Sequence, residues 1–290
     1  MNILIFGGTG MLGIPVTFKL KLLGHQIKLF TRNPGKASLI FGNLVEIIHG
    51  DILNNQHLHK AIQSTQAIHI NLSGDIEDIA VEKIASAARN HNIKKITYIS
   101  GDSVCPENAW FPMVKRKLLA EEHIENSGIP FTIFRPTWFM ESIPKFIRQG
   151  RAYFIGKKDL AFHLVAAEDY SLMVSNSINN PATDNKKLYI HGPEKLSLAW
   201  AIEQYYKTFY PRIKSISYRP PWMMAFVAFL LSDSELTYQV KLMRFFSMIG
   251  EIGDGSQTNE ILGPPQITFR QWLEKRKKLE KMDFHIPQVK

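Results

Sequence analysis

The chain has 290 residues and carries 35 Lys and Arg against 26 Asp and Glu, a formal net charge of +9. This length fits one large domain, or a major domain with a smaller lobe. A hydrophobic content of 45% with 21% charged residues is ordinary for a soluble protein with a well-packed core. The single cysteine, Cys105, excludes an intramolecular disulfide framework and favours a reducing compartment.

Neither the apolar stretch at the start of the sequence nor its longest apolar run predicts insertion into a membrane. The apolar stretch Asn2–Phe6 is too short for the core of a signal peptide, and the longest apolar run, Trp222–Leu231, falls short of the roughly 20 residues that span a bilayer. We expect a cytoplasmic protein in which this run forms a buried helix, the alternative being a surface contact for a membrane or a partner. The basic run Lys275–Lys278 lacks interleaved aromatic residues, so we expect a solvated face and no nucleic-acid partner.

The first motif is a glycine loop. The short apolar run Ile3–Phe6 is followed by Gly7, Gly10 and Gly13 and then by an apolar stripe at helical spacing, which predicts a strand, a tight turn and a helix. This order is typical of a phosphate cradle at a helix N-terminus, the alternative being a purely structural turn. The residues predicted here to bind a dinucleotide are Gly7, Thr9, Gly10, Met11, Leu12 and Gly13.

The end of the second predicted strand, Gln26–Phe30, indicates which nicotinamide cofactor is bound. A site for NAD usually places a carboxylate here, whereas a site for NADP places a cation against the 2′-phosphate. Thr31 and Arg32 occupy the position, with Lys36 nearby and no carboxylate. Because a planar guanidinium suits phosphate, we predict NADP(H); a solvent-facing arginine is the alternative.

Further strands are predicted at Leu44–His49, Gln66–Asn71, Lys95–Ser100 and Phe131–Phe134, each separated by a helical segment. This alternation predicts a parallel sheet with helices on both faces and ligands at the carboxyl ends of its strands. Asp51 is a candidate acceptor for the adenine amine, or alternatively the N-cap of the next helix. His57 and His59 lack a third ligand, so no metal site is predicted. The candidate cofactor residues from these strand ends are Asp51, Ile52, Ser73, Ser100 and Pro136.

Beyond Gly150 the regular alternation stops. Short strands are predicted near Tyr153 and Phe162, a helix at Glu168–Ile178 and a strand at Leu188–His191, followed by a largely helical remainder. We therefore predict an α/β fold: a Rossmann-type doubly wound parallel sheet in residues 1–150, and a smaller, mostly helical C-terminal lobe in residues 151–290 that takes substrate or partner.

The motifs in this order resemble the NmrA-like branch of the atypical short-chain dehydrogenase/reductases. The resemblance covers about two-thirds of the chain. It implies NADP(H) on a Rossmann fold, with a small C-terminal lobe for substrate. The motifs that carry it are the glycine loop, Thr31–Pro34, Gly50-Asp51, Lys117-x-x-x-Glu121, Ser127–Pro136 and His191–Glu194.

One departure from the wider family concerns catalysis. Short-chain dehydrogenases carry Tyr-x-x-x-Lys, in which the tyrosine donates a proton to the substrate carbonyl. Here Lys117 stands four residues after Met113, and alignment on Lys115 places Phe111 at the tyrosine position. Reductases of phenolic ethers and lignans also lack the tyrosine and use the lysine as acid or base. The resemblance thus implies that Lys117 is catalytic, or alternatively that it only holds the cofactor ribose.

These features predict an NADPH-dependent reductase or isomerase of a small, apolar carbonyl or quinone-like substrate. The aromatic stretch Trp138-Phe139-Met140, with Trp110 and Phe111, is expected to line the pocket, with Phe139 against the cofactor. The alternatives are a non-catalytic NADP(H) sensor and an assembly factor, both acting through a protein partner. An oligomer is compatible with the sequence.

Overall fold

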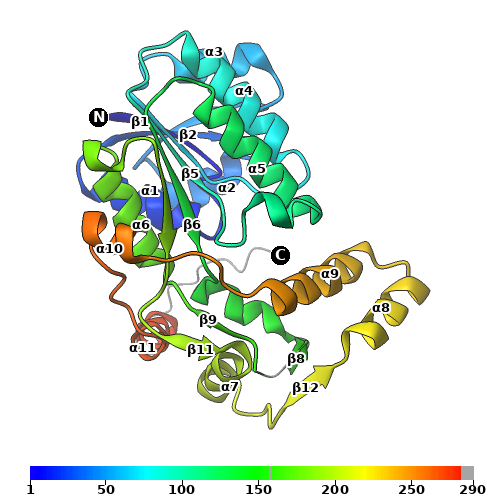
Figure 1. Ribbon diagram of the computed structural model, residues 1–290. Coiled ribbons are helices and arrows are strands. Elements are labelled where there is room, and N and C mark those ends of the chain that lie inside the picture. Colours follow the sequence, from blue (N-terminus) through cyan, green and yellow to red (C-terminus); the bar gives the residue numbers. More distant parts are fainter. Residues whose placement is uncertain (157–158, 282–290) are drawn as a thin grey trace. The chain divides into compact units, whose positions relative to one another are not determined.

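The structure is a computed structural model that describes residues 1–156 and 159–281 (Figure 1). Its contacts define two compact units, neither of them continuous in sequence. The first unit comprises residues 1–136, 167–190 and 253–265, and the second comprises the intervening segments and residues from 266 onward. The division of the chain at residue 150 stays a prediction, since these contacts group its segments differently.

The first unit is built on a seven-stranded sheet with the order β10-β6-β5-β4-β1-β2-β3, and every pairing in it is parallel. From β1 the chain adds β2 and β3 on one side of the sheet and then β4, β5 and β6 on the other, so the topological switch point lies between β1 and β4. This is the arrangement of a Rossmann fold, and the predicted fold class is confirmed. The strand predicted at Leu188–His191, which the sequence places in the C-terminal lobe, is β10, and it pairs with β6 at the edge of this sheet. The strands are β1 (Asn2–Phe6), β2 (Gln26–Thr31), β3 (Glu46–His49), β4 (Ala67–Ile70), β5 (Lys95–Ile99), β6 (Phe131–Pro136) and β10 (Lys186–Ile190).

Helices cover both faces of this sheet (Figure 1). Helices α3, α4 and α5 pack in one layer, and α1 packs against α6 in the other. Because both faces are covered, the central strands β4, β5 and β6 are buried along their whole length. Asn54 caps α3 with its side chain, so the alternative in which Asp51 is the N-cap is wrong. The helices are α1 (Gly13–Leu22), α2 (Pro34–Phe41), α3 (Asn55–Ile62), α4 (Glu77–Arg89), α5 (Pro112–Glu125), α6 (Ala167–Ser177) and α10 (Ser256–Leu262).

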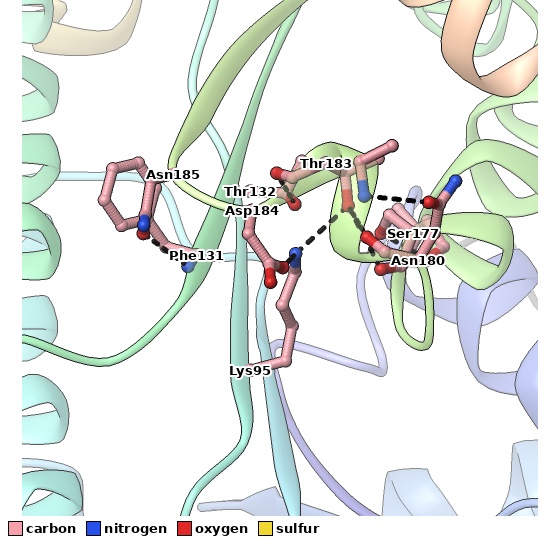
Figure 2. Close-up of polar contacts among 10 residues, drawn as sticks. Lys95, Phe131, Thr132, Ser177, Asn180, Thr183, Asp184 and Asn185 are labelled. Carbon is pink, nitrogen blue, oxygen red and sulfur yellow. Dashed lines mark hydrogen bonds and ion pairs between the residues drawn. The ribbon is translucent and has the colours of Figure 1, made fainter.

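Polar contacts at the amino ends of β5 and β6 fix the edge strand β10 (Figure 2). The buried Lys95 ammonium pairs with the Asp184 carboxylate and donates to Thr183 Oγ1 at 3.0 Å. Thr132 Oγ1 donates to the Thr183 carbonyl at 2.8 Å, and the Asn185 amide donates to the Phe131 carbonyl at 2.7 Å. Burial lowers the pKa of Lys95, an effect that Asp184 opposes. These contacts fix the turn that precedes β10 against the first residues of β5 and β6.

The second unit combines two small sheets with helices. Strands β7 (Ile147–Arg148), β8 (Arg151–Ile155) and β12 (Ile216–Arg219) form one sheet, and β9 (Ala161–His163) pairs antiparallel with β11 (Lys195–Ser197) in the other. Its apolar core includes Phe154, Phe162 and Tyr205. The helices are α7 (Leu198–Phe209), α8 (Pro221–Leu230), α9 (Ser234–Ile249) and α11 (Phe269–Lys281).

Most of the apolar run Trp222–Leu231 forms helix α8, which begins one residue earlier at Pro221 and has Leu231 as its C-cap, but the expected burial is wrong. Ala228 is the one buried residue of α8, while Trp222 and Phe229 are 72% and 78% exposed. A uniformly apolar helix predicts burial only when other elements cover it, and in the described part of the second unit α8 packs mainly on α9. None of the helices among the described residues is both long and apolar enough to cross a membrane.

His69, in the middle of β4, makes stability depend on pH. It is fully buried, and burial lowers its pKa from 6.5 to about 3. Below about pH 6.5, His69 is protonated in the unfolded chain but stays neutral in the folded chain. The free energy of unfolding therefore falls as the pH drops from 6.5 toward 3. Between pH 7 and pH 5 we expect His69 to cost about 2 kcal/mol of unfolding free energy. Urea unfolding at both pH values should show this loss in the wild type and not in His69→Gln; equal losses would contradict it.

Candidate cofactor site

The glycine loop after β1 has the close packing that its sequence predicts. The Gly10 amide donates to the Gly7 carbonyl at 3.1 Å, and Gly7 has a positive φ of +75°. A Cβ on Gly13 would lie 2.2 Å from the Gly7 carbonyl oxygen, whereas a Cβ on Gly10 would meet only that oxygen, at 3.3 Å. Gly7 therefore permits the turn, Gly13 permits the close approach of α1, and Gly10 leaves an exposed backbone facing outward.

A pocket of about 390 Å³ lies beside this loop, at the carboxyl ends of β1 and β2. It brings together six of the predicted cofactor residues: Gly7, Thr9, Thr31, Arg32, Ile52 and Ser73. The predicted residues that do not line it are Gly10, Met11, Leu12, Gly13, Asp51, Ser100, Lys117, Pro136 and Phe139. Its further lining residues are Phe6, Phe30, Asn33, Lys36, Leu72, Ile76, Glu77 and Ala80, which combine an apolar floor with polar groups at the β2 end.

Two cations stand at the β2 end of the pocket. Arg32 follows β2 directly, and Asn33 accepts from the Lys36 amide and so caps α2, which places Lys36 in the first turn of that helix. Among residues 1–156 and 159–281, no carboxylate forms an ion pair with Arg32 or Lys36. The acidic lining residue Glu77 is itself neutralised from within the fold. This end of the pocket is therefore electropositive.

Lys117 is held by a buried acidic partner that the sequence did not reveal. Its Nζ lies 2.8 Å from Glu77 Oε1, and the same oxygen accepts from the Tyr98 hydroxyl at 2.6 Å. Glu77 is 2% exposed and Lys117 is 8% exposed. Burial raises the pKa of Tyr98 well above 10, and the Glu77 charge adds to the effect. Lys117 does not line the pocket itself, but its partner Glu77 does.

Ser100 also turns toward the interior. Its hydroxyl donates to Glu121 Oε1 at 2.5 Å, and Arg135 binds both oxygens of the same carboxylate. Glu121 is 1% exposed. This network ties β5, α5 and β6 together, so the motif residue Glu121 has a structural role beneath the strand ends.

The aromatic residues expected to line a substrate pocket pack differently. Trp138 is partly buried, contacts Phe162 and Phe246, and packs against the core of the second unit, to which Met140 belongs. Phe139 is buried in the same unit, while Trp110 of the first unit is 58% exposed. Burial raises the pKa of the Cys105 thiol, which agrees with an ordinary loop cysteine.

Fold and pocket define a dinucleotide-binding Rossmann protein, with a glycine loop opening a helix at the switch point of a parallel sheet. The chain belongs to the NAD(P)H-binding family, whose match covers residues 7–164. A nicotinamide dinucleotide as cofactor is thereby confirmed, as is the resemblance to the NmrA-like reductases.

Three relatives illustrate the range of this group. The chain is 27% identical over 220 residues to an isoflavone reductase homolog of Solanum tuberosum, covering 67% of this chain and 70% of that protein. It is 23% identical over 207 residues to a photosystem II assembly factor of Trieres chinensis, covering 66% and 64%. In fold it is similar to the NADPH-dependent quinone oxidoreductase of Escherichia coli solved with NADPH, with a TM-score of 0.75, 20% identity and coverage of 94% and 99%.

Proposed function

We propose that the protein is an NADPH-dependent reductase of a small, apolar carbonyl or quinone-like compound, located in the cytoplasm. The observation that carries the choice of NADPH over NADH is the electropositive end of the pocket, where Arg32 and Lys36 stand without acidic partners among the described ion pairs. A 2′-phosphate there gains charge-assisted hydrogen bonds that a ribose hydroxyl cannot supply. Reductase activity is supported by the isoflavone reductase and quinone oxidoreductase relatives.

The chain's own residues then have separate tasks. The glycine loop and the α1 N-terminus hold the pyrophosphate, while Phe30, Ile52 and Leu72 give the adenine an apolar surface. Bound NADPH supplies a hydride, and reduction of a carbonyl to an alcohol then requires one proton. In this proposal Lys117 delivers that proton, directly or through a water, and Glu77 orients its ammonium.

Replacing Arg32 with alanine tests the cofactor assignment. We expect NADPH to bind about tenfold to a hundredfold more weakly, because charge-assisted hydrogen bonds to the phosphate are lost, and NADH to bind almost unchanged. Direct titration of wild type and variant with NADPH, NADP⁺ and NADH measures both effects. Lys60→Ala, which removes an exposed cation outside the pocket, is the matched control. Equal losses for both cofactors would contradict the assignment.

A non-catalytic NADP(H) sensor or assembly factor is the second candidate. It is favoured by the exposed aromatic face of α8, by Met113 at the position of the family's tyrosine, and by the relative that is an assembly factor. The same titration separates the two candidates, since a sensor requires unequal affinities for NADPH and NADP⁺. NADPH oxidation with quinone acceptors, together with similar affinities for both forms, supports the enzyme.

A further inference from the structure

We propose that the second unit contains a binding site for a divalent transition-metal ion of the zinc class, formed by His163, His191 and Glu251. One ligand atom from each of these three side chains lies within 4.8 Å of the other two. Among the residues that the structure describes, no other group of three or more histidine, cysteine or acidic side chains meets this condition. Two imidazoles and one carboxylate are a zinc-type donor set that leaves a fourth position open to water.

The three ligands come from segments that the backbone holds in place. His163 ends β9, and its carbonyl accepts from the Gly192 amide at 3.2 Å. A Cβ on Gly192 would lie 1.7 Å from the Leu164 carbonyl oxygen, so the residue after His191 packs directly on the backbone after His163. Glu251 follows Gly250, whose φ of +67° ends α9 and whose amide donates to the Phe246 carbonyl. The site is therefore largely formed before any ion arrives.

The carboxylate is the most constrained of the three. Glu251 Oε1 accepts from the His163 amide at 2.5 Å, and Oε2 lies 2.9 Å from His163 Nδ1. The two imidazole rings stack, with centroids 5.2 Å apart and planes 22° apart. In a tetrahedral zinc site, bonds of about 2.0 Å place the ligand atoms roughly 3.3 Å apart. An ion can therefore replace the contact between His163 Nδ1 and Glu251 Oε2 with small shifts, while the His163 amide continues to orient the carboxylate through Oε1.

The identity of the ion follows from the donors. Imidazole nitrogen favours Zn²⁺, Co²⁺, Ni²⁺ and Cu²⁺, whereas Ca²⁺ and Mg²⁺ require oxygen ligands throughout. Lys195, which faces His163 across the β9–β11 pair, places its Nζ 3.1 Å from Glu251 Oε2. Its side chain is 54% exposed, so it can swing into solvent and leave the carboxylate to the metal. Lys195 therefore competes with the ion for Glu251.

Zinc binding to the purified, untagged full chain tests the site. Equilibrium dialysis against ZnCl₂ at micromolar free zinc should give about one ion per chain for the wild type. His191→Ala and Glu251→Gln should each weaken binding at least about tenfold. Lys195→Gln should tighten it severalfold, because a competing cation is removed. His59→Ala is the control, since His59 and His91 form another two-imidazole contact, with 3.5 Å between Nδ1 and Nε2, but lack a carboxylate.

Circular dichroism identifies any variant that fails to fold. A second measurement uses the wild type and so does not depend on the variants. Co²⁺ bound to the wild type should give the intense visible bands of a four-coordinate site with nitrogen ligands, and Zn²⁺ should displace it. The proposal is overturned if the wild type binds no zinc at micromolar concentration, if the ligand variants bind as the wild type does, if His59→Ala abolishes binding, or if Co²⁺ shows only the weak bands of an octahedral aquo ion. In those cases the contact between His163 and Glu251 serves only to hold the fold.

Discussion

Replacing Lys117 with methionine is expected to lower the free energy of unfolding by about 3–5 kcal/mol. The change leaves the Glu77 carboxylate buried with one hydrogen bond, from Tyr98, and without its counter-ion. A buried charge that has lost its partner is far costlier than a buried pair replaced as a whole. Urea unfolding at neutral pH measures the loss, and Lys115→Met, on the exposed face of the same helix, should change it little.

The double variant Lys117→Met/Glu77→Gln distinguishes this cause from simple loss of packing. It removes both charges while retaining an acceptor for the Tyr98 hydroxyl, so we expect it to recover most of the lost stability. If the double variant were as unstable as Lys117→Met, the buried charge would not be the cause.

This pairing changes how activity data on Lys117 must be interpreted. A Lys117 variant that loses activity has lost both the proposed proton donor and the buried partner of Glu77, which lines the pocket. Comparison with Tyr98→Phe separates these effects, since that variant removes a hydroxyl bound to Glu77 and leaves the amine in place. A catalytic role for Lys117 requires that its loss reduce turnover at saturating NADPH well beyond the loss in Tyr98→Phe.

The second large effect is expected in the glycine loop, where Gly10→Ala and Gly13→Ala should separate two roles. A methyl group on Gly13 meets backbone atoms of Gly7 and Gly8 at 2.2 and 2.6 Å, so α1 must move away from the loop. We expect Gly13→Ala to cost about 1–3 kcal/mol of stability and to abolish measurable NADPH binding.

Gly10→Ala should leave stability nearly unchanged, because its methyl group points into open space apart from one contact at 3.3 Å. It should nevertheless weaken NADPH binding about a hundredfold, since the methyl group keeps the pyrophosphate from the loop amides and costs charge-assisted hydrogen bonds. Thermal unfolding and NADPH titration of both variants measure the two effects. Unchanged affinity in Gly10→Ala would show that the loop does not approach a phosphate.

The sequence predicted those parts of the site that depend on local order. The glycine loop and Arg32 each lie next to a strand end, so their position follows from a few neighbouring residues. The Lys117–Glu77 pair joins residues 40 positions apart, and no spacing rule connects two helices that meet only in the folded sheet. Glu77 lies in the first turn of α4, where an acidic side chain suits the helix dipole without any buried partner.

The exposure of α8 and the grouping of His163, His191 and Glu251 also depend on parts of the chain that are distant in sequence. Apolar content shows that a helix can be buried, but what covers it depends on elements elsewhere in the chain. His163 and Glu251 are 88 positions apart and become neighbours because α9 ends beside β9. Chemistry that arises from such distant encounters cannot be read from residue patterns.

The interleaved segments of the first unit have a consequence for synthesis on the ribosome. Strand β6 remains an unprotected sheet edge until β10, ending at Ile190, has emerged to pair with it. Helix α10, which packs on β10 and α6, follows only after most of the second unit has been made. The nucleotide-binding unit therefore cannot finish folding first. An exposed parallel edge over that interval is open to mispairing with other nascent chains, so chaperone protection matters most while residues between β6 and α10 are being translated.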